Sequence, residues 1–363
     1  MTDNSEKIRK SLHPSRIILP MIIGLAIVGW LLYDEWDGEA LSVITFSWYA
    51  VFYLFIAFIM MAIRDIGYII RLRVLTDGGI SWRKLFQIIM LWEFSSAVTP
   101  SAIGGTGVAV FFLYKEGYSA GRSTAIVMAT SILDELYFIL MFPLLFIIIG
   151  STDMFSTDGK PVIHFTDLFN NRYFYFAAIG YLIKFSYTSL LFYGLFFNPL
   201  AIKKLLVLIF RLPLIRKWKS GAVKAGDDII ESSEVLKKKT FKFWLRAFGA
   251  TFFSWTARYW VVNFLLLALI VGIPGFVIDI YDHFIIFGRQ LVMWIMMLVL
   301  PSPGGSGFAE WIFQDYLKDF IPVGFVVIVA FIWRLISYYP YLIIGVFVIP
   351  RWAKRVFSKK AKV

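Results

Sequence analysis

The chain has 363 residues, of which 59% are hydrophobic and only 17% are charged, and its mean hydropathy is +0.74. Soluble domains typically contain about 25% charged residues, so this composition excludes a soluble globular protein and predicts an all-α integral membrane protein. The absence of cysteine excludes disulfides and thiolate metal sites, and the three histidines form no ligand pair. We therefore expect no metal or other cofactor.

Apolar segments long enough to cross a bilayer recur along the chain. A transmembrane helix needs about 20 mostly apolar residues, and six segments meet this requirement: 17–33, 43–63, 123–149, 173–197, 244–271 and 321–349. No small-residue cleavage site follows the first of them, so we interpret it as a retained helix and not as a signal peptide.

Two further apolar stretches are interrupted by proline and glycine. Segment 85–114 contains Pro100-Ser-Ala-Ile-Gly-Gly-Thr-Gly107, and segment 284–316 contains Pro301-Ser-Pro-Gly-Gly-Ser-Gly307. At ~1.5 Å per residue, each half is too short for a ~30 Å hydrocarbon core. We therefore predict two re-entrant helical hairpins, with a proline-kinked single span as the alternative.

The basic residues are concentrated in alternate loops. With the N-terminus in the cytoplasm, 28 of the 36 Lys and Arg residues fall in cytoplasmic segments, whereas the outer loops are acidic. This bias predicts a multi-pass protein of a bacterial inner membrane with both termini in the cytoplasm. The net charge of +12 then belongs to a surface that faces anionic lipid, so no nucleic acid is expected as a partner.

These segments predict two membrane halves joined by a polar connector. Within the connector, an apolar and basic stretch followed by a polar stretch predicts an interfacial helix and a short polar helix. The expected regions are a cytoplasmic N-terminal segment (1–16), a first membrane half (17–199), a connector (200–243), a second membrane half (244–349) and a basic tail (350–363).

The two glycine motifs are followed by charged membrane helices at the same spacing. The distance from Gly105 to Asp134 is 29 residues, and so is the distance from Gly305 to Arg334. Basic residues flank the first hairpin and acidic residues flank the second, so the two are expected to enter from opposite sides. We interpret them as an inverted repeat, which is the architecture of secondary transporters.

Charged residues inside the apolar segments are the candidate site residues, because a charge in the bilayer core costs roughly 2.5 to 3.5 kcal/mol. Asp134 and Arg334 occupy equivalent repeat positions, so we predict an ion pair between them, which either contacts substrate or only locks the two halves together. For Lys184 and Arg246 we expect snorkelling to the interface. The predicted substrate-binding residues are Gly104, Gly105, Gly107, Gly304, Gly305, Gly307, Arg334, Arg258 and Arg289, and those predicted to balance charge or couple to ions are Asp134, Glu135 and Glu310.

Arg258 and Arg289 have two interpretations at this point. Each guanidinium is a planar fork that suits a lipid phosphate. Each is equally compatible with a side chain that snorkels to the membrane interface, and Arg289 is predicted to lie within a turn of one. The sequence leaves both interpretations open.

The motif Thr99-Pro-Ser-Ala-Ile-Gly-Gly-Thr-Gly107, together with Pro301-Ser-Pro-Gly-Gly-Ser-Gly-Phe-Ala-Glu310 and the helix containing Arg334, resembles the lysylphosphatidylglycerol synthase transmembrane family of flippase-like membrane proteins. The resemblance spans roughly residues 15–355. In the bifunctional members, such a membrane domain moves aminoacylated phospholipid between leaflets and a separate soluble domain makes that lipid. This chain ends 14 residues after its last predicted span, so we expect it to lack the synthase domain.

The function expected from the sequence is transport of a phospholipid or a polyprenyl-phosphate-type lipid between leaflets. Because no Walker-type ATP-binding loop is present, the expected energy source is an ion gradient, or none for a scramblase. The alternatives are a membrane-embedded enzyme that acts on a lipid phosphate, with Glu310 or Asp134 as general acid or base, and a non-catalytic subunit of a lipid-modifying system. The expected partners are a lipid substrate, the anionic lipid surface, and either a lipid-modifying enzyme or a second copy of the chain.

Overall fold

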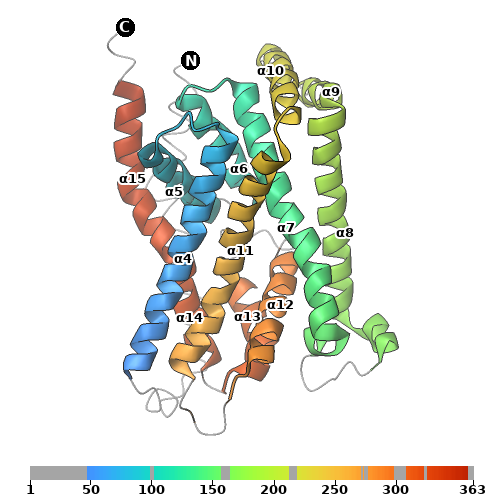
Figure 1. Cartoon of the computed structure of the whole chain (residues 1–363), viewed down its shortest axis with the longest axis vertical. Coiled ribbons are helices and arrows are strands. Elements are labelled where there is room, and N and C mark those ends of the chain that lie inside the picture. Colours follow the sequence, from blue (N-terminus) through green and yellow to red (C-terminus); the bar gives the residue numbers. More distant parts are fainter. Residues whose placement is uncertain are drawn as a thin grey trace.

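The structure is a computed structural model that describes residues 47–98, 102–156, 164–211, 219–270, 273, 277–297, 308–322 and 325–358. Over these residues the regular structure is helical, with no strand. The longest helices run close to one common axis and form an elongated bundle (Figure 1). The prediction of an all-α membrane protein is confirmed.

Five helical segments are long and apolar enough to cross a membrane. Each matches one of the predicted spans, and the predicted span 17–33 lies outside the described residues. They are α4 (Trp48–Leu75), α7 (Ala120–Phe155), α8 (Arg172–Phe192) with the π-helical turn η2 (Tyr193–Phe197), α11 (Phe241–Leu269), and the segment Ile328–Trp352 formed by α14 (Val326–Ser337) and α15 (Tyr339–Ser358).

The boundary predicted for the α4 span was wrong. The helix continues to Leu75, whereas the hydropathy pattern placed the end of the span at residue 63. Arg64 and Arg71 are therefore buried helix residues, with 2% and 4% of their surfaces exposed, and not cytoplasmic loop residues. Without these two residues, the predicted cytoplasmic segments still contain most of the basic residues.

Two of the long helices are interrupted where the sequence contains glycine or proline. In α7, Gly150 adopts φ 83° and ψ 166°, a left-handed conformation that favours glycine. The span predicted at 321–349 is divided between α14 and α15 at Tyr338, two residues before Pro340. Because proline lacks the N–H that would continue the helical pattern, the chain changes direction there.

Two pairs of shorter helices occupy the predicted hairpin segments. The first pair is α5 (Trp82–Val98) and α6 (Ala102–Lys115), and the second is α12 (Ile280–Met296) and α13 (Phe308–Leu317). In Figure 1 the first pair lies toward one end of the bundle and the second toward the other. That these pairs re-enter the membrane as inverted repeats stays a prediction.

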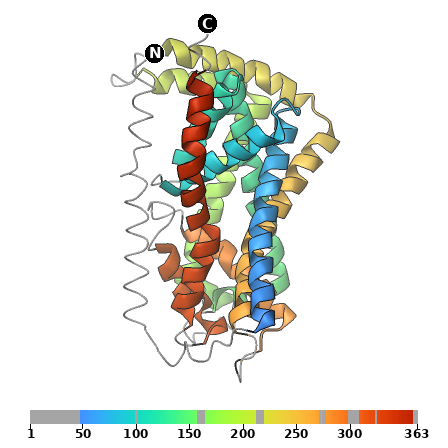
Figure 2. The same ribbon diagram turned by 90° about the vertical axis from the view of Figure 1, so that its left-hand side faces the viewer.

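Two connector helices lie across the end of the bundle that is nearer to α5 and α6. These are α9 (Pro199–Ile209) and α10 (Lys219–Lys237) (Figure 2). Helix α10 packs closely on α7, because a Cβ atom at Gly121 would come within 2.5 Å of the carbonyl oxygen of Ala225. Asp77 at the end of α4 also contacts Arg122 at 3.2 Å and Lys239 at 2.5 Å, so ion pairs join the helices at this end.

Helices α4 and α11 pack closely against each other. The hydroxyl of Ser254 on α11 donates to the carbonyl oxygen of Arg64 on α4 at 2.8 Å. A Cβ atom at Gly67 would meet the Ser254 hydroxyl and would lie 2.7 Å from the carbonyl oxygen of Ala250. This contact places Arg64 and Arg71 beside the centre of the bundle.

Candidate functional site

Asp134 on α7 is paired with Arg71 on α4, and its Oδ1 also accepts a hydrogen bond from Trp255 Nε1 on α11 at 2.6 Å. Arg71 Nη1 contacts the hydroxyl of Thr251 at 3.3 Å as well. The predicted ion pair between Asp134 and Arg334 was therefore wrong. Arg71 was expected in a loop, whereas α4 extends to Leu75 and brings Arg71 to the carboxylate.

A second group of charges surrounds Arg64. Its Nη1 donates to Asp65 Oδ1 on the same helix at 2.8 Å, and its Nη2 donates to Glu93 Oε2 on α5 at 2.5 Å. The hydroxyl of Tyr341 on α15 donates to both oxygens of Asp65, at 2.9 and 3.1 Å. We refer to Arg64, Asp65, Glu93 and Tyr341 as the Arg64 cluster. It connects α4 with the first short-helix pair and with the last helix.

Tyr68 links these two groups of charges. The guanidinium carbons of Arg64 and Arg71 each lie 4.7 Å from the centre of its ring. Stacking of a guanidinium on an aromatic ring is favourable when the pair is shielded from water, and Tyr68 is 5% exposed. Tyr68 therefore connects the Arg64 cluster with the pair formed by Arg71 and Asp134.

Glu135, the next residue after Asp134, is paired with Lys184 on α8. The distance from Lys184 Nζ to Glu135 Oε2 is 2.6 Å, and Lys184 is 3% exposed. Its ammonium also lies 4.5 Å from the centre of the Phe138 ring. The expectation that Lys184 snorkels to the interface was wrong, because a partly buried carboxylate on the neighbouring helix compensates its charge. Arg246, by contrast, is exposed near the start of α11.

Arg258 lies near the middle of α11 without a carboxylate partner among the described residues. Its guanidinium carbon is 5.5 Å from the ring centre of Trp255 and 5.2 Å from that of Trp294 on α12. The side chain is only partly buried. Arg258 differs in this from four other cations of the bundle, each of which contacts at least one carboxylate: Arg64, Arg71, Lys184 and Arg289.

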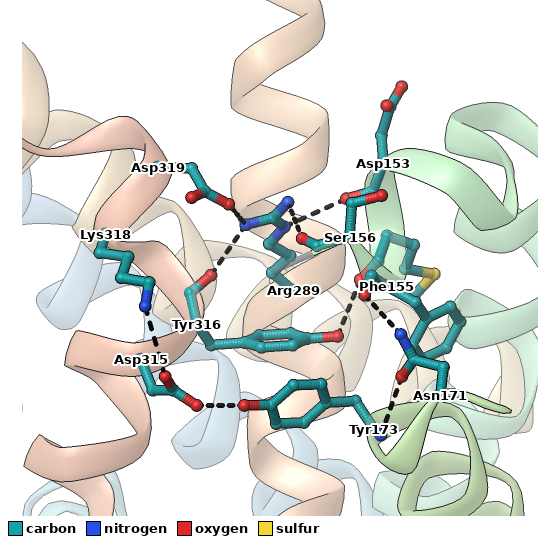
Figure 3. Close-up of polar contacts among 11 residues, drawn as sticks. Asp153, Phe155, Ser156, Asn171, Tyr173, Arg289, Asp315, Tyr316, Lys318 and Asp319 are labelled. Atoms are coloured by element: carbon teal, nitrogen blue, oxygen red, sulfur yellow. Dashed lines mark hydrogen bonds and ion pairs between the residues drawn. The ribbon is translucent and has the colours of Figure 1, made fainter. Parts of the chain in front are cut away.

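Arg289 on α12 is surrounded by oxygen atoms from two other parts of the bundle (Figure 3). Its Nη1 donates to Asp319 Oδ2 at 2.6 Å and to the carbonyl oxygen of Tyr316 at 3.0 Å. Its Nε and Nη2 donate to the carbonyl oxygens of Asp153 and Ser156 at the end of α7, at 3.1 and 2.6 Å. The guanidinium thus holds α7, α12 and α13 together.

Arg289 therefore presents no free guanidinium fork in this structure, while its role in substrate binding and its position at the membrane interface stay predictions. Two of its acceptors are carbonyl groups left without helical partners beyond Gly150. The same segment is held by two further hydrogen bonds, from Tyr316 to the carbonyl of Met154 at 2.7 Å and from Asn171 to that of Phe155 at 2.9 Å. Tyr173 also donates to Asp315 (Figure 3).

Arg334 is 4% exposed, and its guanidinium carbon lies 4.4 Å from the ring centre of Tyr338. Its role in substrate binding stays a prediction. Gly105 lies where α6 passes close to α5, since a Cβ atom there would be 3.1 Å from the Cα of Ser96. Gly107 is in the second turn of α6, where its backbone N–H group takes part in the hydrogen bonds of the α-helix.

Three of the predicted glycines, Gly304, Gly305 and Gly307, lie outside the described residues. Gly104 is the third residue of α6 and Glu310 the third residue of α13, and the side chain of Glu310 is outside the described part of the structure. Their proposed roles stay predictions. Within the described ranges, no group of three or more His, Asp or Glu side chains is placed to hold a metal ion.

The Arg64 cluster was not predicted, because the span 43–63 was ended before Arg64, whereas the helix continues to Leu75. One signal for it was present: Arg64 and Arg71 are seven positions apart, with the apolar run Ile66-Gly-Tyr-Ile-Ile70 between them. Residues seven apart lie on the same face of a helix. Glu93, in the middle of an apolar half-helix, was a second signal for a buried partner.

A family model described as the lysylphosphatidylglycerol synthase TM region matches residues 17–345. A protein described as a UPF0104 membrane protein, from Archaeoglobus fulgidus (strain ATCC 49558 / DSM 4304 / JCM 9628 / NBRC 100126 / VC-16), is 27% identical over 305 residues, which cover 80% of this chain and 84% of that protein. The family match and the apolar helices identify a multi-pass membrane protein. The chain belongs to the lysylphosphatidylglycerol synthase transmembrane-region family.

Proposed function

We propose that this protein moves a lipid with a phosphate-containing headgroup, either a phospholipid or a polyprenyl-phosphate-type lipid, between the leaflets of the cytoplasmic membrane. The family is defined by a transmembrane region, which supports a role within the bilayer and favours transport over catalysis. The basic residues at the end of the bundle formed by α9 and α10 support a cytoplasmic location for that end.

The observation that carries the proposal is the uncompensated charge of Arg258. A cation in the middle of a membrane helix requires an anion or water, and no described carboxylate supplies the anion. Trp255 and Trp294 hold the guanidinium on their faces and leave its N–H groups for a ligand. A phosphate matches this fork in charge and geometry, and the acyl chains of the lipid stay in the surrounding bilayer.

The two short-helix pairs support a path for the headgroup. They lie toward opposite ends of the bundle (Figure 1), so each extends only partway along it. Broken helices that meet near the bilayer midplane are typical of substrate sites in secondary transporters. In this proposal the headgroup passes between the two pairs and contacts Arg258 on the way.

Reconstitution into liposomes tests the proposal. Fluorescently headgroup-labelled phosphatidylglycerol is placed in both leaflets, and an impermeant quencher reports how fast inner-leaflet lipid reaches the outside. We expect Arg258→Ala to slow movement at least about tenfold, because a charge-assisted hydrogen bond contributes roughly 1.5 to 3 kcal/mol. Arg258→Lys should retain part of the rate, since it keeps the charge without the fork.

Arg246→Ala is the matched control, because Arg246 is exposed near the start of the same helix. It should leave the rate unchanged. A wild-type protein that moves no labelled lipid, including a polyprenyl-phosphate probe, would overturn the proposed function. Equal rates for wild type and Arg258→Ala would overturn the assignment of Arg258.

A further inference from the structure

Among the described ionic groups in the bundle interior, the Arg64 cluster is the one in which two carboxylates contact a single guanidinium. Asp134 is matched by Arg71, and Glu135 by Lys184. Arg64 instead contacts both Asp65 and Glu93. With both carboxylates ionised, the three side chains carry one uncompensated negative charge within the bundle.

The geometry also leaves one donor of Arg64 unused. Its Nε–H is buried and has no hydrogen-bond acceptor among the described atoms, although Arg64 is only 2% exposed. Glu93 binds through the adjacent Nη2 alone. A carboxylate that engaged both Nε and Nη2 would form the bidentate arrangement that arginine favours. A second arrangement of the cluster is therefore available, in which Glu93 accepts hydrogen bonds from both Nε and Nη2 of Arg64.

A proton is the ligand that this arrangement suits. A metal ion beside the guanidinium would be repelled by it, and two carboxylates offer too few ligands for the six or more that Ca²⁺ requires. A proton needs no coordination shell. It binds to a carboxylate oxygen, removes the excess negative charge, and leaves the neutral acid able to donate a hydrogen bond.

Several titratable or charged groups act on the cluster from neighbouring helices. Tyr341 on α15 bonds to Asp65, and Tyr68 on α4 lies between Arg64 and Arg71. Asp134 on α7 is paired with Arg71. Helix α11 contributes the hydroxyl of Ser254, and α14, which also packs against α4, carries Arg334.

We propose that Asp65 and Glu93 share one exchangeable proton and that its binding and release are coupled to lipid movement. This inference rests on the proposed function and deepens it by naming the coupling ion. Protonation of Asp65 weakens its bond to Arg64 and leaves Glu93 to bind the guanidinium through both Nε and Nη2. Because Glu93 lies on α5 and Tyr341 on α15, the exchange alters how the first short-helix pair is held against α4 and α15.

Infrared difference spectroscopy tests the proton site without reference to transport. Protonated carboxylic acids have a carbonyl-stretch band that shifts in D₂O, and in wild type this band should appear as the pH is lowered. Glu93→Gln and Asp65→Asn should each remove the titrating band. Glu135→Gln is the matched control and should retain it, because Glu135 is already compensated by Lys184. A titrating band that persists in both cluster variants, or a wild type without one, would overturn the proton site.

The transport assay then tests the coupling. In wild-type proteoliposomes the rate should vary with pH, by at most about tenfold per pH unit for one proton. Glu93→Gln and Asp65→Asn should flatten this dependence, whereas Asp227→Asn, on the exposed surface of α10, should keep it. An unchanged pH dependence in both cluster variants would overturn the coupling. If wild type moved no lipid at any pH, the proposed function would fail while the infrared result still decided the proton site.

Discussion

Adjacent residues of α7 are compensated by different helices. Asp134 binds Arg71 on α4, and Glu135 binds Lys184 on α8. Consecutive residues of a helix point about 100° apart, so two acids in a row reach two neighbours. Each pair therefore connects α7 to a different part of the bundle. Loss of one partner leaves the other as an unpaired charge, which is far more costly than loss of the pair.

This reasoning predicts the behaviour of the pair formed by Glu135 and Lys184. Lys184→Met should destabilise the protein by about 3 kcal/mol, because it leaves a carboxylate uncompensated inside the bundle. Adding Glu135→Gln should restore much of the loss. Thermal unfolding in detergent measures both. Lys203→Met, which removes a surface ion pair with Asp227, should have little effect. A single Lys184→Met variant as stable as wild type would contradict a structural role for this pair.

At the scale of the helices, the contact between α4 and α11 depends on small side chains. Gly67 lies against Ala250 and Ser254, so the two backbones come close enough for the Ser254 hydroxyl to bond to α4. Small residues permit such close packing between membrane helices, where van der Waals contact supplies much of the association energy. The position of Arg64 follows from this contact.

We predict that Gly67→Ala separates these two helices. The added methyl group would lie 2.7 Å from a backbone oxygen, which cannot move aside as a flexible side chain can, so we expect a loss of roughly 1 to 3 kcal/mol. Thermal unfolding should show a lower midpoint. The matched control is Gly249→Ala on α11, where a Cβ atom meets nothing within 4 Å. That change should be neutral or stabilise by up to about 1 kcal/mol, since alanine favours the helix. Equal effects of both substitutions would argue against the close contact.

The contact of α12 and α13 with the end of α7 depends on backbone carbonyl groups instead of small side chains. Beyond the break at Gly150, the carbonyl groups at the end of α7 are bound by Arg289 from α12 and Tyr316 from α13 (Figure 3). Satisfying these groups within the protein replaces the water that they would otherwise need. The second short-helix pair is thereby attached to the end of α7.

At the scale of the whole molecule, the topology is open to a direct test, because the natural chain has no cysteine. Single cysteines at Gly221 on α10 and at Thr166 near the start of α8, both exposed, should be labelled by an impermeant maleimide from the cytoplasmic and the outer side, respectively. Labelling of right-side-out and inside-out membrane vesicles measures this. The reverse pattern would invert the proposed orientation.

The same measurement distinguishes a re-entrant first pair from a kinked single span. Arg83 lies at the start of α5, and Ser119 lies between α6 and α7. If the pair is re-entrant, Arg83→Cys and Ser119→Cys should both be labelled from the side that labels Gly221→Cys. Labelling from opposite sides would show instead that α5 and α6 together cross the membrane.

The sequence by itself determined the membrane class, the approximate positions of the five described spans apart from the end of α4, and the locations of the two short-helix pairs, because these depend on the length and hydrophobicity of local segments. It did not determine the partners of the buried charges. Arg71, rather than Arg334, binds Asp134; Lys184 is paired with Glu135; and Arg289 binds the end of α7. Such pairings join residues distant in sequence, and only the packing of helices decides which charges meet. The uncompensated Arg258 and the two carboxylates at Arg64 emerge only from that packing, because a charge can be recognised as unmatched only after its neighbours are known.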